Sequence, residues 1–219
     1  MDVQNPTATL ADLLARSVSE RDENWEAQFL KVLPTASVRL VKDQPINGPD
    51  GWPYMMVSIV DGAAEAEALI DVLRWLSTRG VGLVVNPEKP MPDFVVSYGM
   101  IANLRERGEF LTASAPRKGA LEIRHGQQMF TGAPSLAFFP EYQRVVVREF
   151  LRQQRVEAPK VLMVSEDQQN WDLAFSLESL GNPPPHEHKG IAEALGWFLP
   201  AHYSVALISE KTLPGFGPL

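Results

Sequence analysis

The sequence predicts an α+β protein built from two small domains. From residue 118 to residue 210, short apolar runs and amphipathic stretches follow the order strand, helix, strand, strand, helix, strand. That order is typical of a ferredoxin-like βαββαβ domain. In the first half, apolar residues at helical spacing alternate with short apolar runs, which predicts a mixed α+β domain with three or four strands. Because a ferredoxin-like scaffold serves many unrelated tasks, this fold class indicates architecture and not activity.

The first half begins with an amphipathic helix. Four apolar residues recur at helical spacing after Thr9, the expected N-cap: Leu10, Leu13, Leu14 and Val18. The following elements are expected in this order: a helix at 23–32 stopped by Pro34, a strand at 37–41, a loop at 42–53, a strand at 54–60, a helix at 66–76 closed by Gly80, strands at 81–85 and 94–96, and a helix at 98–107 closed by Gly108.

A segment without a hydrophobic period separates the two halves. Residues 112–119 combine small side chains with Pro116 and Gly119, so we place the boundary there and predict domains of residues 1–115 and 116–219. The second domain is expected to contain, in order, a strand at 121–124, a short edge strand at 129–130, a helix at 141–153, strands at 161–164 and 171–177, a helix at 187–198, a strand at 203–209 and a Pro/Gly tail at 213–219.

The charge balance and the absence of cysteine exclude several classes of function. With 20 Lys and Arg against 27 Asp and Glu, the chain has a formal net charge of −7, the reverse of what phosphate binding needs. We therefore expect no nucleic-acid partner and no attraction to anionic membranes. The chain has no cysteine, which excludes disulfides, thiolate nucleophiles, zinc–thiolate sites and iron–sulfur clusters.

The start of the chain and its apolar runs predict a cytoplasmic location. Residues 1–6 have neither the basic nor the apolar region of a signal peptide. No apolar run approaches the roughly 18 residues that a membrane-spanning helix needs. We therefore expect a cytoplasmic protein without a membrane partner.

Several short strings resemble a bacterial family, the enhanced serine sensitivity or SseB-like proteins. In the first half, residues 82–87 (GLVVNP) place an apolar strand and an Asn-Pro turn as that family's N-terminal domain does. In the second half, residues 129–134 (MFTGAP) precede 139–142 (FPEY) and a long helix, and 172–177 (DLAFSL) end a strand pair. The second half is similar to the family's C-terminal domain over nearly its whole length. The resemblance implies a two-domain cytoplasmic protein without established enzymatic activity, linked by its name to serine and sulfur metabolism.

His186, Glu187 and His188 form the triplet that most resembles a metal site. Imidazole and carboxylate groups are common metal ligands, but residues two apart at a helix start point to different sides. The ordinary explanation is a solvated helix start in which Glu187 interacts favourably with the helix dipole. We therefore predict no metal and no cofactor.

Arg144, Arg148 and Arg152 lie at i, i+4 and i+8 and form a basic stripe on the predicted helix. Such a stripe is suited to an anion or an acidic partner. A solvated outer face has the same appearance. We expect the opposite face to be buried through four residues: Tyr142, Val145, Val146 and Phe150.

Trp52 and Trp171 are the remaining candidates for partner binding. Trp52 lies between Gly51 and Pro53 in a predicted loop, and Trp171 opens a strand beside a polar turn. Tryptophan is frequent at interface hot spots because it combines a large apolar area with a polar group. A Trp52 side chain folded onto the core of the first domain is the ordinary alternative.

The sequence favours a non-enzymatic binding or regulatory module. It has no nucleophile elbow, phosphate loop or dinucleotide fingerprint, so no catalytic residue is predicted. We expect a protein partner or a second copy of the chain. Three alternatives stay open: an amino-acid sensor with a ligand between its domains, a metal-dependent hydrolase using His186 or His188, and a secretion-type chaperone.

Overall fold

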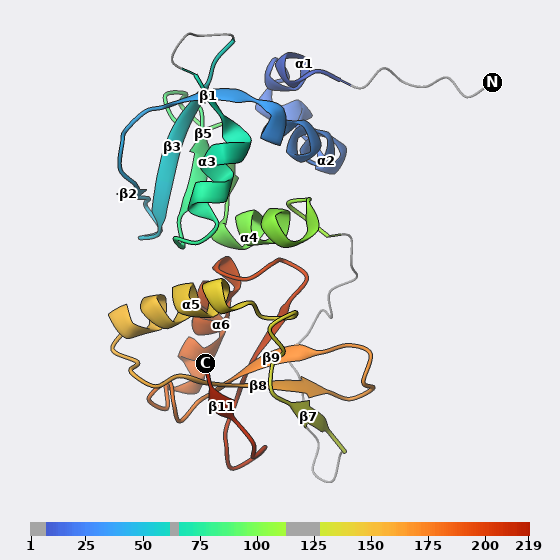
Figure 1. The fold of residues 1–219 in the computed structure, drawn as a ribbon, viewed down its shortest axis with the longest axis vertical. Helices are drawn as coiled ribbons and strands as arrows, with labels where there is room; N and C mark the ends of the chain where they lie inside the picture. Colours follow the sequence, from blue (N-terminus) through green and yellow to red (C-terminus); the bar gives the residue numbers. More distant parts are fainter. Residues whose placement is uncertain (1–7, 62–65, 113–127) are drawn as a thin grey trace, which may run out of the picture. The chain divides into compact units, whose positions relative to one another are not determined.

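The protein is an α+β protein whose chain divides into two compact units, Met1–Phe110 (unit 1) and Leu111–Leu219 (unit 2). The structure, a computed structural model, describes residues 8–61, 66–112 and 128–219. The predicted boundary after residue 115 and the predicted strand at 121–124 lie outside the described residues. Figure 1 shows the elements of each unit.

Unit 1 contains a mixed sheet with the strand order β4-β1-β3-β5-β6, and β2 also pairs with β3. Its strands are β1 (Ser37–Leu40), β2 (Ile46–Asn47), β3 (Pro53–Ile59), β4 (Glu67–Ala68), β5 (Gly82–Val85) and β6 (Phe94–Val96). Its helices are α1 (Leu10–Leu14), α2 (Glu23–Val32), α3 (Leu69–Leu76) and α4 (Tyr98–Arg107), with 3-10 turns at Val18–Glu20 and Leu33–Thr35. β3 and β5 run parallel, and α3 lies between them in the chain, so they form a βαβ unit.

The helices of unit 1 follow from local sequence signals. Asp22 caps α2 by accepting a hydrogen bond from the Trp25 N–H, and Ser97 caps α4 in the same way. Gly108 ends α4 with a φ of 78°, a left-handed conformation that glycine adopts without a steric penalty. The helices predicted at 23–32 and 98–107 are therefore confirmed.

Three predictions for unit 1 are wrong in detail. The helix predicted at 66–76 begins at Leu69, because residues 67–68 instead form strand β4, which pairs with β1. The first helix ends at Leu14, and Val18 is exposed, because Ser17 and Glu20 form a capping box that starts a separate 3-10 turn. The predicted loop at 42–53 contains strand β2, whose two residues pair with Tyr54 and Pro53 of β3.

The core of unit 1 lies between the helices and one face of the sheet. Trp25 stacks on Phe29 with ring centroids 4.8 Å apart, and Phe29 contacts Phe94 at 5.4 Å. Leu69, Leu73 and Leu76 of α3 are buried in the same cluster. A β-carbon at Gly82 would lie 2.7 Å from the Tyr54 ring, so only glycine fits at the start of β5.

Unit 2 contains a second mixed sheet with the order β10-β9-β8-β11, and β7 also pairs with β8. Its strands are β7 (Phe130–Gly132), β8 (Lys160–Ser165), β9 (Asp172–Ser176), β10 (Ser204–Ile208) and β11 (Gly217–Pro218). Its helices are α5 (Glu141–Gln153) and α6 (His188–Trp197), with a 3-10 turn at Pro185–Glu187. The structure confirms four predicted elements of this unit: the helix at 141–153 and the strands near 161–164, 171–177 and 203–209. The predicted tail, in contrast, contains strand β11, which pairs with β8.

The ferredoxin-like arrangement of unit 2 is not confirmed. A split βαβ arrangement inserts another strand between the two strands that a helix connects. Here β9 and β10, which α6 connects, are direct parallel neighbours from Ser204↔Asp172 to Ile208↔Ser176. The order of elements from α5 to β10 was predicted correctly, but the described neighbour relations form an unsplit βαβ unit.

α5 and α6 lie on the same side of this sheet (Figure 1). The Phe150 and Phe198 rings stack at 4.6 Å, and the Gln143 side chain donates a hydrogen bond to the Phe198 carbonyl at 3.0 Å. The buried residues of α5 are Gln143, Val146, Val147 and Leu151, whereas Val145 is exposed. The predicted burial of Val145 is therefore wrong, because the buried stripe follows 143, 147 and 151.

Candidate functional site

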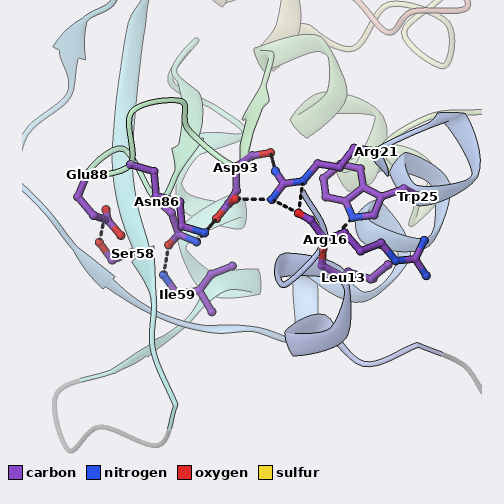
Figure 2. Close-up of polar contacts among 10 residues, drawn as sticks. Leu13, Arg16, Arg21, Trp25, Ser58, Ile59, Asn86, Glu88 and Asp93 are labelled. Carbon is purple, nitrogen blue, oxygen red and sulfur yellow. Dashed lines mark hydrogen bonds and ion pairs between the residues drawn. The ribbon is translucent and has the colours of Figure 1, made fainter. Parts of the chain in front are cut away.

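A buried carboxylate in unit 1 lies at the centre of a polar cluster formed by Arg21, Asn86, Lys89 and Asp93 (the Asp93 cluster; Figure 2). Asp93 Oδ1 accepts a hydrogen bond from Arg21 Nη2 at 2.8 Å. Its Oδ2 accepts bonds from Asn86 Nδ2 and Lys89 Nζ, each at 2.6 Å. Only 2% of the Asp93 side chain is exposed. The carboxylate is therefore paired with two cations and bonded by an amide.

Asn86 positions this carboxylate from the end of β5. Its φ of 53° is left-handed, a conformation that asparagine tolerates better than most residues. Its Oδ1 accepts a hydrogen bond from the Ile59 N–H at 2.8 Å while its Nδ2 donates to Asp93. The Asn-Pro turn therefore connects β3 with the loop that precedes β6.

Arg21 connects the same cluster to the first helices. Its guanidinium donates to the carbonyl oxygens of Arg16 and Asp93 and lies 4.7 Å from the centre of the Trp25 ring. The Trp25 indole N–H in turn donates to the Leu13 carbonyl of α1 at 2.9 Å (Figure 2). Thus one carboxylate stabilises the contact of α1 and α2 with the sheet.

The Asp93 carboxyl is suited to a structural role. Burial raises its pKa, but hydrogen bonds from Asn86, Lys89 and Arg21 outweigh burial, and the pKa lies below its ordinary value. A carboxylate with a lowered pKa and bonds to both oxygens is a poor proton acceptor near neutral pH. We therefore infer that the Asp93 cluster stabilises the fold of unit 1.

A groove of about 640 Å³ in the described part of unit 1 is a candidate ligand site. It lies where α2, α3 and α4 end, and we call it the three-helix groove. Its lining combines apolar and basic residues: Lys31, Pro34, Ile70, Leu73, Arg74, Ser77, Leu104, Arg105 and Gly108.

Each of the three helices contributes one cation to the groove from its last turn. These cations are Lys31 of α2, Arg74 of α3 and Arg105 of α4. Basic residues are favourable at helix C-termini because the helix dipole is negative there. Three helix ends contribute roughly −1.5 charges, against the three positive charges of these side chains. The helix ends therefore offset about half of the positive charge of the lining, and Asp71 and Glu106 beside the groove offset part of the rest.

Ser77 holds one of these cations in place. It is buried, its Oγ donates to the Arg74 carbonyl at 2.7 Å, and Arg105 Nη1 donates to the same Oγ at 2.9 Å. Its carbonyl accepts the Tyr98 O–H at 2.6 Å. Burial raises the pKa of Tyr98, so this hydroxyl is a neutral donor. The position of Arg105 at the groove is therefore set by buried groups.

The other two cations have weaker restraints. Arg74 pairs with Asp71 at 2.7 Å, and both side chains are largely exposed, so this pair contributes little. The Lys31 ammonium has no ion-pair partner in the part of the chain that the structure describes. No carboxylate belongs to the groove lining, although Asp71 and Glu106 lie beside Arg74 and Arg105.

The predicted arginine stripe lies on α5, and each arginine has partners inside unit 2. Arg144 donates to the carbonyl oxygens of Phe139 and Pro134 at 2.8 and 2.6 Å. Arg148 bonds to Glu141 and to the Leu219 main-chain oxygen at 2.6 and 2.7 Å. Arg152 pairs with Glu149, and both are exposed. Arg144 and Arg148 thus connect segments of the unit.

The two predicted tryptophans lie in different units, and both are half-buried. The Trp52 N–H donates to Asp50 Oδ1 at 3.1 Å in the turn before β3. The Trp171 indole N–H donates to the Gln168 carbonyl at 3.1 Å in the turn between β8 and β9. Both tryptophans therefore take part in the local structure of a turn.

The side chains of His186 and His188 each lie near an oxygen atom of a neighbouring residue. His186 is exposed, with its Nε2 at 3.7 Å from a Glu187 oxygen, and His188 Nε2 lies 2.9 Å from the Pro183 carbonyl. Among the described residues, no three His, Cys, Asp or Glu side chains are grouped closely enough to hold a metal ion.

The sequence analysis did not identify the three-helix groove. A basic residue near the end of each of three predicted helices was visible in the sequence. These helix ends come together through tertiary packing. A basic residue at the end of one helix does not show which other helix ends will lie beside it.

Comparisons with known proteins identify no relative. No family model matches the chain, and neither a curated protein nor a solved structure matches it. Within residues 8–61, 66–112 and 128–219, every helix is too short or too polar to cross a membrane.

Proposed function

We propose that the protein is a non-enzymatic binding module and that the three-helix groove is its ligand-binding surface. The observation that carries the proposal is the composition of the groove: its lining contains three cations from three helices together with apolar side chains, in a chain of net charge −7. Apolar lining residues supply affinity, and a few fixed polar groups supply orientation. The ligand is therefore anionic and partly apolar.

Asp93 itself is not a candidate for the general acid or base of an enzyme. General acid–base catalysis needs a group whose pKa lies near the working pH. Asp93 is the most buried carboxylate of the ion pairs described above, and its pKa is lowered. Its charge therefore stabilises the unit and does not exchange protons near neutral pH.

We also propose that the protein is related to the SseB-like proteins that its sequence resembles. The resemblance implies a cytoplasmic protein of two domains without established enzymatic activity, connected with serine or sulfur metabolism. A binding partner that is acidic and partly apolar fits both this implication and the charge of the groove.

An amino-acid sensor is the second candidate, and the groove volume favours it. About 640 Å³ lies within the usual range for small-molecule sites. However, a zwitterionic amino acid needs an acceptor for its ammonium group, and no carboxylate belongs to the groove lining. The groove is thus better suited to an anion than to a zwitterion.

Capture from lysate tests the proposed binding surface. Tagged wild-type protein is compared with Arg105→Met, which keeps most of the apolar stem and removes the charge. The control is Arg107→Met on the same helix, at a position outside the groove lining. We expect captured proteins and small molecules, identified by mass spectrometry, to be lost in Arg105→Met and retained in Arg107→Met. Equal capture by all three proteins would contradict the groove as the binding surface.

A further inference from the structure

We propose that the natural ligand of the three-helix groove is a small anionic amphiphile, with one carboxylate or phosphate group and an aliphatic body. This inference rests on the proposed function and names the ligand class for the same site.

The size of the groove favours a small molecule over a folded protein surface. Its volume of about 640 Å³ is within the range of pockets that enclose small ligands. A stable protein–protein interface uses roughly 20–30 residues on each side, whereas this groove is lined by nine. The groove is therefore too small to form such an interface by itself.

The apolar residues of the groove lining are suited to an aliphatic body. Leu73 belongs to the buried core, and Ile70, Leu104 and Pro34 are half-buried beside it. Aromatic rings are absent from the lining, so the ligand gains from methylene burial and not from ring stacking. Each methylene removed from water strengthens binding by about fourfold.

Arg105 is the residue that we expect to fix the head group. Its guanidinium is positioned by the buried Ser77 Oγ at 2.9 Å, and guanidinium geometry matches carboxylate and phosphate oxygens. Lys31 and Arg74 add positive charge from two other helices. The lining contains no carboxylate, and Asp71 and Glu106 beside it pair with Arg74 and Arg105, so an amine head group would have to compete with these arginines.

Isothermal titration calorimetry of the full chain with hexanoate, octanoate and decanoate, all below their micelle concentrations, tests the inference. We expect affinity to rise with chain length, by about fourfold per methylene at first. Octanol and octylamine are expected to bind at least about tenfold more weakly than octanoate. Octyl phosphate, compared with octanoate, identifies which head group the site prefers.

The matched variants are the same as in the capture experiment. Arg105→Met is expected to weaken octanoate binding about tenfold, whereas Arg107→Met changes it by less than about twofold. Lys31→Met, at an exposed position, is a second variant that leaves the Ser77 contacts intact. Thermal unfolding of each variant verifies that the protein is folded.

The following outcomes overturn the inference. Octanol that binds as tightly as octanoate, or octanoate binding that is equal in all variants, would show non-specific apolar binding. Absence of binding by every amphiphile, while capture from lysate still depends on Arg105, would refute the ligand class and leave the proposed function standing. If neither amphiphile binding nor capture from lysate depended on Arg105, both the ligand class and the proposed function would be refuted.

Discussion

Replacement of Asp93 by alanine is expected to lower the free energy of unfolding of unit 1 by about 3–5 kcal/mol. The substitution leaves the Arg21 guanidinium, whose side chain is 11% exposed, without its carboxylate. It also removes the acceptor for Asn86 Nδ2 and Lys89 Nζ. Urea unfolding followed by hydrogen exchange of peptides from α2 and β5 reports the stability of unit 1 alone.

The exposed pair of Asp71 and Arg74 provides the control for this prediction. Its nitrogen–oxygen distance, 2.7 Å, is similar to that of Arg21 and Asp93, but both side chains are more than half exposed. Asp71→Ala is therefore expected to cost less than about 1 kcal/mol. Equal costs for Asp71→Ala and Asp93→Ala would show that the Asp93 cluster does not hold α1 and α2 on the sheet.

The stabilising effect of Asp93 is expected to disappear at low pH. Its pKa is lowered in the folded protein, so the contribution is complete above the unfolded value of about 3.9 and is lost as the pH falls toward the lower folded value. The difference in unfolding free energy between wild type and Asp93→Asn, measured from pH 7 to pH 2, should therefore shrink below about pH 4. A difference that stays constant over this range would contradict the assignment.

Phe175→Ala is expected to destabilise unit 2 by about 3–5 kcal/mol. Phe175 is fully buried in β9, where it pairs with Val161 of β8 on one side and Leu207 of β10 on the other. Removal of its ring leaves a cavity at the centre of the sheet that neighbouring strands cannot fill without losing their register. Hydrogen exchange of peptides from β8 and β9, as a function of urea, measures the loss.

Val145→Ala on α5 is the matched control in the same unit. Val145 is 49% exposed, so its truncation is expected to change the stability by less than about 0.5 kcal/mol. A small cost for Phe175→Ala, comparable with that of Val145→Ala, would mean that β9 is not the centre of the unit 2 core.

The elements that the sequence predicted best are those with strong local signals. The ends of α2 and α4 follow from Asp22, Ser97 and Gly108, and all three act through neighbouring backbone groups. Strands β2, β4 and β11 were missed because each has two residues and is defined by its pairing with the strand beside it. Local patterns cannot report such pairings.

The arrangement of unit 2 shows a different limit. The chain order of α5, β8, β9, α6 and β10 was predicted, but this order is compatible with both split and unsplit βαβ units. Only the register of β10 against β9 distinguishes them. Side-chain packing in the folded protein decides which strands become neighbours. The alternation of apolar residues along one strand does not show which strand will lie beside it.

The candidate site could not be predicted from the sequence, for a related reason. The arginine stripe on α5 was visible because its spacing lies within one helix, and the structure then shows that Arg144 and Arg148 bond to other segments of unit 2. The three-helix groove draws single cations from three helices that are far apart in sequence. Its composition became apparent only when the helix ends were brought together.

The central claim, that the three-helix groove binds the natural ligand, is tested most directly by photo-crosslinking in cells. A photoactivatable amino acid replaces Ile70 inside the groove, and in a second protein it replaces Arg39, an exposed residue of β1 outside the lining. We predict a specific adduct at position 70 that disappears when Arg105→Met is added, and no such adduct at position 39. The same adducts at both positions, or an adduct at 70 that persists in Arg105→Met, would contradict the claim.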